Sequence, residues 1–120
     1  MKRVLIVDDA CFMRMTITMM LKNHDFEIVG EAGTGIDGVK KYKELRPDIV
    51  TLDITMPEMS GLEALKLIRE FDPQANVIMI SALGQDLLVR EAILNGAKSF
   101  IVKPFNEAQV VQVFNKILGA

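Results

Sequence analysis

Acidic residues end two apolar runs of this sequence, and a lysine ends a third. Asp8 and Asp9 follow the run VLIV, Asp53 follows IVTL, and Lys103 follows FIV. If the runs are parallel strands of one sheet, their ends lie on one edge, so three carboxylates and one ammonium group converge. A cluster of like charges is unfavourable unless a cation lies within it, and Mg²⁺ prefers carboxylate oxygens. The pattern therefore predicts a site that binds a divalent metal ion and handles a phosphoryl group.

Each acidic residue also has a structural interpretation. Asp8 or Asp9 could cap the helix that follows, but capping accounts for only one of the pair. Asp53 could simply meet solvent or cap the next loop. Its alternative role is that of a nucleophile, because aspartate carboxylates can form aspartyl-phosphates. In that case the backbone carbonyl of Thr55 is a further candidate ligand for the metal ion.

Two more strand ends carry polar groups that suit a phosphoryl group. A lysine is usually a solvated surface residue, but Lys103 ends an apolar run and precedes Pro104, from where it can reach a phosphoryl oxygen as a point charge. Ser81 ends the run VIMI and is either a turn residue or a hydroxyl donor to the same group. The combined pattern is more specific than any one of its parts.

Apolar runs alternate with segments of helical period along the 120 residues. The runs predict strands near residues 3–8, 27–31, 48–53, 76–81 and 99–103. The periodic segments predict helices near residues 11–23, 35–45, 60–71, 85–95 and 106–118, the third with a capping box at Ser60 and Glu63. Fivefold alternation predicts an α/β fold with helices on both faces of a parallel sheet. Ligands bind such sheets at the carboxyl ends of the strands, where strand order reverses.

Composition excludes several classes of protein. A length of 120 residues suits one domain. The net charge of −2 gives no electrostatic footprint for nucleic acid, and no apolar stretch is long enough for a membrane span. A single cysteine cannot form an internal disulfide, so a reducing cytoplasm is the expected compartment.

With these motifs the whole chain, residues 1–120, resembles the receiver domains of two-component response regulators, and within them the single-domain chemotaxis regulators. The motifs that carry the resemblance are residues 7–9 (VDD), 52–57 (LDITMP) with Gly61, 81–82 (SA) and 103–105 (KPF). The resemblance implies a single receiver domain with a flavodoxin-like (βα)5 doubly wound fold. It also implies a five-stranded parallel sheet in the order 2-1-3-4-5.

The resemblance also implies roles for the residues at the strand ends. Asp53 would accept a phosphoryl group from the phosphohistidine of a CheA-like sensor histidine kinase, and Lys103 would contact that group. The ligands of Mg²⁺ would be Asp8, Asp9, Asp53 and the Thr55 carbonyl. Thr55 stands where family members tune dephosphorylation, so the lifetime of the phosphate is left open.

Two further residues would convert phosphorylation into a change of surface. Ser81 would move toward the phosphoryl group and Phe100 would turn inward behind it. Ser81 stands where threonine is commoner, and Phe100 stands where some chemotaxis members have tyrosine, so no phenol hydrogen bond takes part. The implied target is the flagellar motor switch protein, with a phosphatase as a further partner and a monomer as the expected state.

Three other functions fit parts of the pattern. A phosphorelay carrier would pass phosphate from Asp53 to a His-containing phosphotransferase. A Mg²⁺-dependent phosphohydrolase would use the same aspartate, but the chain has no length for a cap over the substrate. Flavin binding fits the fold, whereas Asp8 and Asp9 would repel an uncompensated phosphate. Because the sequence ends soon after the fifth helix, we expect no output domain and no separate substrate, so the chain is not expected to be an enzyme.

The first helix is rich in methionine and has two apolar sides. One side, expected to pack on the sheet, contains Met13, Ile17, Met20 and Leu21. The other contains Phe12, Met15 and Met19, which either dock the kinase or are covered by neighbouring helices. His24 near the helix end is expected to suit the helix dipole, and Cys11 is expected to behave as a small apolar residue.

Overall fold

Strands and helices alternate along residues 1–119, which are the residues described by this computed structural model. The elements are β1 (Lys2–Val7), α1 (Cys11–Leu21), β2 (Phe26–Ala32), α2 (Gly35–Leu45), β3 (Ile49–Asp53), α3 (Gly61–Phe71), β4 (Val77–Ser81), α4 (Asp86–Leu94), β5 (Ser99–Val102) and α5 (Glu107–Leu118). All ten predicted elements are present, and their ends differ from the predictions by at most two residues.

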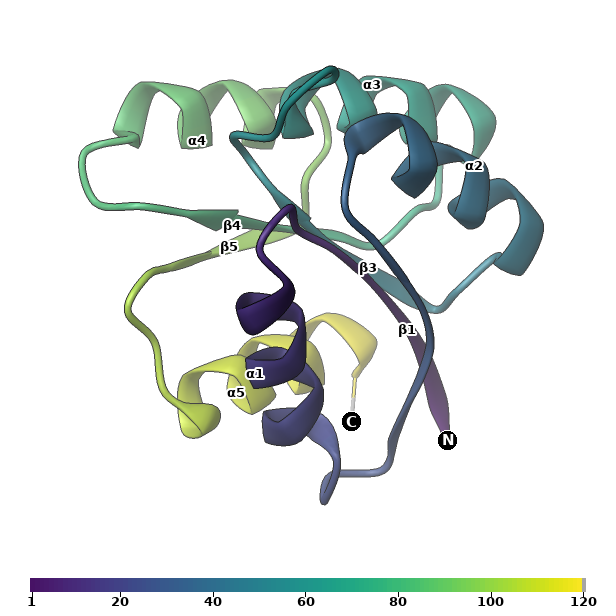
Figure 1. Ribbon diagram of the computed structural model, residues 1–120, viewed down its shortest axis with the longest axis vertical. Coiled ribbons are helices and arrows are strands. Elements are labelled where there is room, and N and C mark those ends of the chain that lie inside the picture. The colour runs from purple at the N-terminus through teal and green to yellow at the C-terminus, as the bar shows by residue number, and fades with distance from the viewer. Residues whose placement is uncertain (120) are drawn as a thin grey trace.

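The five strands form one parallel sheet in the order β2-β1-β3-β4-β5. This confirms the fold class and the order implied by the resemblance. In Figure 1, α1 and α5 cover one face of the sheet, and α2, α3 and α4 cover the other. Strand order reverses at β1, which lies between β2 and β3, so the carboxyl ends of β1 and β3 adjoin at the place where such folds bind ligands.

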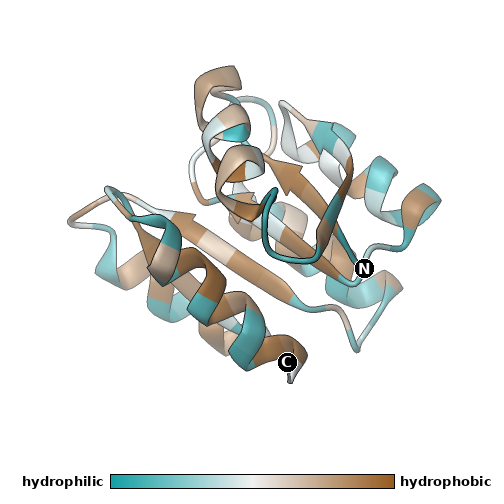
Figure 2. Ribbon diagram, turned by 90° about the horizontal axis from the view of Figure 1, so that it is seen from below, coloured by the Kyte–Doolittle hydropathy of each residue, from teal (hydrophilic) through white to brown (hydrophobic). Residues whose placement is uncertain are grey.

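The strands are buried on both faces because their side chains alternate between two apolar cores. Val50 and Leu52 of β3 belong to the core under α2 and α3, whereas Ile49 belongs to the core under α1 and α5. Figure 2 shows the central strands in the brown of hydrophobic residues, with hydrophilic residues along the helices around them. The continuous apolar runs of the sequence follow from this double covering.

The hydrogen bonds at the N-terminus of α3 differ from the capping box predicted at Ser60 and Glu63. Ser60 accepts a hydrogen bond from the Glu63 amide at 3.2 Å, but the Glu63 carboxylate accepts from the Ser60 hydroxyl at 3.3 Å and does not reach back to the backbone. The predicted capping box at α3 is therefore only half formed. Both halves are present at α5, where Asn106 and Gln109 bond each other's backbone amides at 2.9 Å.

Helix α1 presents the two predicted sides. The sheet side is confirmed, since Ile17 and Leu21 are fully buried while Met13 and Met20 pack against the same core. The other side is open: the exposed fractions are 76% for Phe12, 57% for Met15 and 67% for Met19. Cys11, at the first turn of this helix, is exposed rather than packed as a small apolar residue.

His24 lies near the end of α1, as expected from the sequence, and it also has a partner on α5. The helix ends at Leu21, so His24 lies in the turn beyond it. Its Nε2 atom is 2.7 Å from Glu107 Oε2, so it links this turn to the start of α5. Within residues 1–119, no helix is long and apolar enough to cross a membrane.

Candidate functional site

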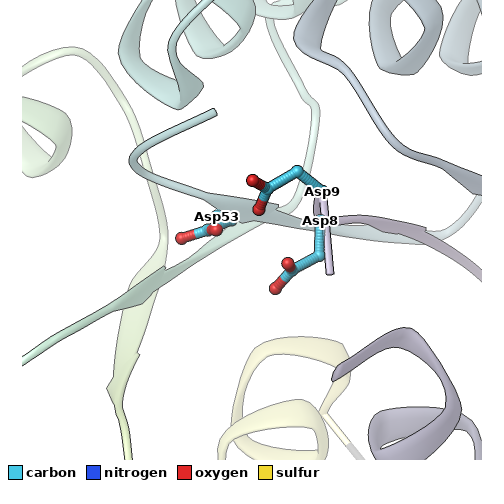
Figure 3. Close-up of side chains that lie close together, drawn as sticks. All are labelled: Asp8, Asp9 and Asp53. Carbon is cyan, nitrogen blue, oxygen red and sulfur yellow. The ribbon is translucent and has the colours of Figure 1, made fainter. Parts of the chain in front are cut away.

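The carboxyl ends of β1 and β3 bring three carboxylates together. Asp53 is the last residue of β3, and Asp8 follows Val7, which pairs with Leu52 in the parallel register. Asp8 and Asp53 are therefore the next pair along the two strands. One oxygen of each of Asp8, Asp9 and Asp53 lies within 4.8 Å of the others, and Figure 3 shows the three carboxylates side by side at the strand ends.

Strand alternation explains why Lys103 joins two of these aspartates. Ile101 lies in the core under α1 and α5, and Lys103, two residues further on, continues on the same side of the sheet. Asp8 and Asp53 continue that side from their own strands. The Lys103 Nζ atom is 3.6 Å from Asp8 Oδ2 and 3.7 Å from Asp53 Oδ1. One ammonium group thus faces two buried carboxylates.

The electrostatics of the cluster favour a further cation. Burial, followed by the negative charge of Asp8, raises the pKa of Asp53 to about 6, although Lys103 opposes the shift. Burial also raises the pKa of Asp8, against the opposing effects of the Ala10 amide and Lys103. Both carboxylates are less stable in their charged forms than they are in water, so Lys103 alone does not compensate the cluster.

Three buried side-chain oxygens at or near this edge have no hydrogen-bond partner among residues 1–119. They are Asp8 Oδ2, Ser81 Oγ and Thr51 Oγ1. Buried polar atoms are nearly always hydrogen-bonded, so Asp8 Oδ2 and Ser81 Oγ, at the strand ends, mark places for a ligand, whereas Thr51 lies within β3. A carboxylate oxygen that lacks a hydrogen bond, within a set of hard oxygen donors, fits Mg²⁺. Thr51 was not singled out from the sequence, where it is only a hydroxyl inside a buried run.

The capping interpretation of Asp8 and Asp9 is wrong. Helix α1 begins after Ala10 without a side-chain cap. Asp8 Oδ1 instead accepts a hydrogen bond from the Ala10 amide at 2.9 Å, which orders the turn between strand and helix. The Arg14 guanidinium donates to the Asp8 carbonyl at 2.6 Å and also bonds Glu31 at 3.0 Å, so the end of β1 is fixed from two sides.

The loops after β3 and β4 are joined by a glutamine that the sequence analysis did not single out. The Gln85 Nε2 atom donates to Thr55 Oγ1 at 2.9 Å, and its Oε1 atom accepts from the Ala82 amide at 2.6 Å. A glutamine before a helix is an ordinary residue in sequence, so only the fold shows this bridge. The role of the Thr55 carbonyl as a metal ligand stays a prediction.

Phe100 lies away from the aspartate cluster on the α4 side of β5. Phe100 is 43% exposed, so the inward position expected for the phosphorylated state is not the one in this structure. Phe100 and Ser81 both line a pocket of about 470 Å³, whose other lining residues include Val89, Ile93 and Val102. Lys103, at the end of the same strand, precedes a cis peptide bond to Pro104.

Comparison with known proteins agrees with this arrangement. The model of the response regulator receiver domain family matches residues 4–115. The chemotaxis protein CheY of Thermotoga maritima is 56% identical over 116 residues, which cover 97% of both chains. CheY of Listeria monocytogenes is 58% identical over 116 residues, which cover 97% of this chain and 98% of that protein.

A solved structure gives the same result in three dimensions. A chain in the crystal structure of the CheX–CheY–BeF3–Mg²⁺ complex from Borrelia burgdorferi superposes with a TM-score of 0.93 at 46% identity, and the match covers 98% of this chain and 89% of that one. The chain therefore belongs to the response regulator receiver domain family, as a CheY-like chemotaxis response regulator.

Proposed function

We propose that this protein is a phosphorylation-dependent switch of chemotaxis, phosphorylated on Asp53 by a CheA-like histidine kinase. The observation that carries the proposal is the buried aspartate cluster. Asp53 ends a central strand beside two further carboxylates and one lysine, and a carboxyl oxygen of Asp8 has no hydrogen-bond partner among residues 1–119. The same proposal takes residues 1–120 as one receiver domain working in the cytoplasm, and as a signalling protein rather than an enzyme with a separate substrate.

The transfer step assigns a distinct task to each side chain. A carboxylate oxygen of Asp53 attacks the phosphorus of the kinase's phosphohistidine, and the phosphorus–nitrogen bond breaks with its electrons leaving on the imidazole. Lys103, 3.7 Å from Asp53 Oδ1, would stabilise negative charge on the phosphoryl oxygens. Asp8, Asp9, Asp53 and the Thr55 carbonyl would hold Mg²⁺, which neutralises charge on those oxygens when bound.

The readout depends on Ser81 and Phe100. The Ser81 hydroxyl is buried without a partner in the described chain, so it is free to bond a phosphoryl group on Asp53. Its movement would empty space beneath Phe100, which would turn inward and reshape the surface formed by α4, β5 and α5. Because Phe100 has no hydroxyl, this coupling acts through packing. The flagellar motor switch protein would bind the reshaped surface by population shift.

The comparisons support the proposal. The related Borrelia burgdorferi complex contains CheY with BeF3, Mg²⁺ and CheX. BeF3 stands in for a phosphoryl group, and we extend both ligands to the Asp53 site here. We further assign the exposed apolar side of α1, formed by Phe12, Met15 and Met19, to kinase docking, and we include a phosphatase among the partners of the monomer.

The test is binding to the N-terminal segment of the flagellar switch protein from the same organism. Affinity is compared between the Mg²⁺ form and the beryllofluoride-activated form, with Asp53→Ala as the control. Activation should tighten binding in the wild type and leave the variant unchanged. Equal binding in all forms, or none, would contradict the motor-switch function and leave a phosphorelay carrier, which passes phosphate to a His-containing phosphotransferase, as the better hypothesis.

A further inference from the structure

We propose that the side chain of Gln85 is a latch that holds the loop between β4 and α4 in the unphosphorylated conformation. Gln85 would act as a positioning residue, because it touches neither the phosphoryl site nor a metal ligand atom. The proposal rests on the phosphorylation switch proposed above, and it adds a barrier that activation must overcome. This barrier would determine how readily phosphorylation changes the surface that a partner binds.

The amide group of Gln85 is satisfied at both ends. Its carbonyl oxygen accepts the Ala82 amide at 2.6 Å, and its nitrogen donates to the Thr55 hydroxyl at 2.9 Å. Gln85 occupies the N-cap position of α4 but makes no side-chain cap bond there. Its side chain therefore serves the loops and not the helix start.

These two bonds join the segments that carry the phosphate-handling groups. Thr55 lies two residues after Asp53, and Ala82 directly follows Ser81. Any shift that brings the Ser81 hydroxyl toward a phosphoryl group on Asp53 also moves the Ala82 amide. Ala82 is held through Gln85 to Thr55, in the loop after the neighbouring strand β3, so the shift must break or stretch the bridge.

Little else holds the outer part of this loop in the described chain. Ala82, Leu83 and Gly84 are all exposed. Gly84 has a φ of +87°, and a Cβ atom placed on it would meet nothing within 4 Å. A segment with few packing contacts is easily moved, so the two bonds of Gln85 contribute a large share of what fixes its resting position.

Removal of the bridge should favour the activated form. A hydrogen bond between neutral groups contributes modestly to stability, so losing two of them should tighten beryllofluoride binding by about five- to tenfold. Affinity for Mg²⁺ alone should stay the same, since the side chain of Gln85 supplies no carboxylate to the cluster. A residue with a purely structural role would not separate these two affinities.

The experiment compares the wild-type chain with Gln85→Met, which keeps the length of the side chain but cannot form either bond. Gln112→Met, at an exposed glutamine of α5, is the matched control. Backbone amide NMR gives the apparent Kd for beryllofluoride at saturating Mg²⁺, the Kd for Mg²⁺ alone, and the hydrogen-exchange rate of the Ala82 amide. Thr55→Val removes one of the two bonds and should tighten beryllofluoride binding by about threefold.

The latch requires tighter beryllofluoride binding and faster Ala82 exchange in Gln85→Met, with unchanged Mg²⁺ affinity and a neutral Gln112→Met. In the double variant with Thr55→Val, binding should be no tighter than in Gln85→Met. If the wild type binds beryllofluoride but Gln85→Met binds it equally or more weakly, the latch is wrong and the phosphorylation site stands. If the wild type does not bind beryllofluoride, both proposals are overturned.

Discussion

Aspartates lie at both ends of the parallel strands, at the edge formed by the amino ends (the amino edge) and at the edge formed by the carboxyl ends (the carboxyl edge). Their bonding partners differ between these two edges. At the amino edge, Asp48 accepts the Arg3 amide at 2.7 Å and the backbone amide of Asp48 donates to the Arg3 carbonyl at 2.8 Å. The Arg3 guanidinium bonds the carbonyls of Leu45 and Arg46, and Asn76 bonds the carbonyl of Asp48. At the carboxyl edge, two buried aspartates share one lysine at 3.6 and 3.7 Å.

The difference shows which edge is built for stability and which for a ligand. Polar groups at the amino edge bond one another, so this edge needs nothing from outside the chain. At the carboxyl edge, the raised pKa values of Asp8 and Asp53 indicate buried charge that the protein itself does not compensate. Removing an acidic group should therefore have opposite effects on stability at the two edges, and only the carboxyl edge should affect ligand binding.

The largest expected effect is the loss of phosphorylation in Asp53→Asn. The amide has no carboxylate oxygen for attack on phosphorus, so no aspartyl-phosphate can form there. Incubation with a radiolabelled phosphorylated histidine kinase should leave the variant unlabelled. The matched variant at the other edge, Asp48→Asn, should be labelled as fast as the wild type. Label on Asp53→Asn would place the acceptor elsewhere and contradict the contrast between the edges.

A second large effect is expected for metal binding by Asp8→Ala. This substitution removes the carboxylate whose Oδ2 atom has no hydrogen-bond partner in the described chain. Mg²⁺ affinity should fall by about 100-fold, toward the upper end of what is typical when groups that support a metal site are lost. Isothermal titration calorimetry measures the change, with Asp48→Ala as the control at wild-type affinity. Equal affinity in Asp8→Ala would remove this residue from the metal site.

The third prediction concerns stability and pH without Mg²⁺. The pKa of Asp53 is about 6 in the folded state and about 3.9 in the unfolded chain, so the folded state binds more protons between these values. The contribution of Asp53 to the free energy of unfolding therefore falls as pH rises from about 4 to about 6, and stays low above that. At pH 7, Asp53→Asn should be more stable than the wild type by on the order of 2 kcal/mol.

Urea unfolding at pH 4 and pH 7 measures this difference. Relative to the wild type, the free energy of unfolding of Asp53→Asn should be higher at pH 7 and less so at pH 4. At pH 7 the difference should also shrink when Mg²⁺ is added, because the cation compensates the charge that the substitution removes. A variant less stable than the wild type at pH 7 would mean that the Asp53 carboxylate stabilises the folded chain. The two edges of the sheet would then not differ in the effect of their carboxylates on stability.

Most of the fold could be predicted from the sequence because each strand end coincides with a change from apolar to polar residues. Asp8, Asp53 and Lys103 follow apolar runs directly, and in a parallel sheet those positions must share an edge. The strand order came from the resemblance, since alternation alone does not say which strands are neighbours. Helical spacing separated the two apolar sides of α1 but did not say whether neighbouring helices cover the side formed by Phe12, Met15 and Met19, which the structure shows to be exposed.

Other features depend on contacts between distant residues and left no local signal. Gln85 and Thr55 are 30 positions apart, so their bond follows only from the way the loops meet. His24 reaches Glu107 across 83 positions, and the sequence favoured the nearer helix end. Ser60 and Glu63 have the spacing of a capping box, yet the glutamate bonds the serine hydroxyl instead of its backbone amide.

The smallest expected effect is at the amino edge. Asp48→Ala removes the acceptor of the Arg3 amide, a bond of 2.7 Å at an exposed position. Because water can replace a lost partner there, the free energy of unfolding should fall by only about 1 kcal/mol, and by the same amount with and without Mg²⁺. Urea unfolding under both conditions tests this. A gain in stability, or a loss that depends on Mg²⁺, would show that the acidic groups at the two edges do not have opposite effects on the stability of the folded chain.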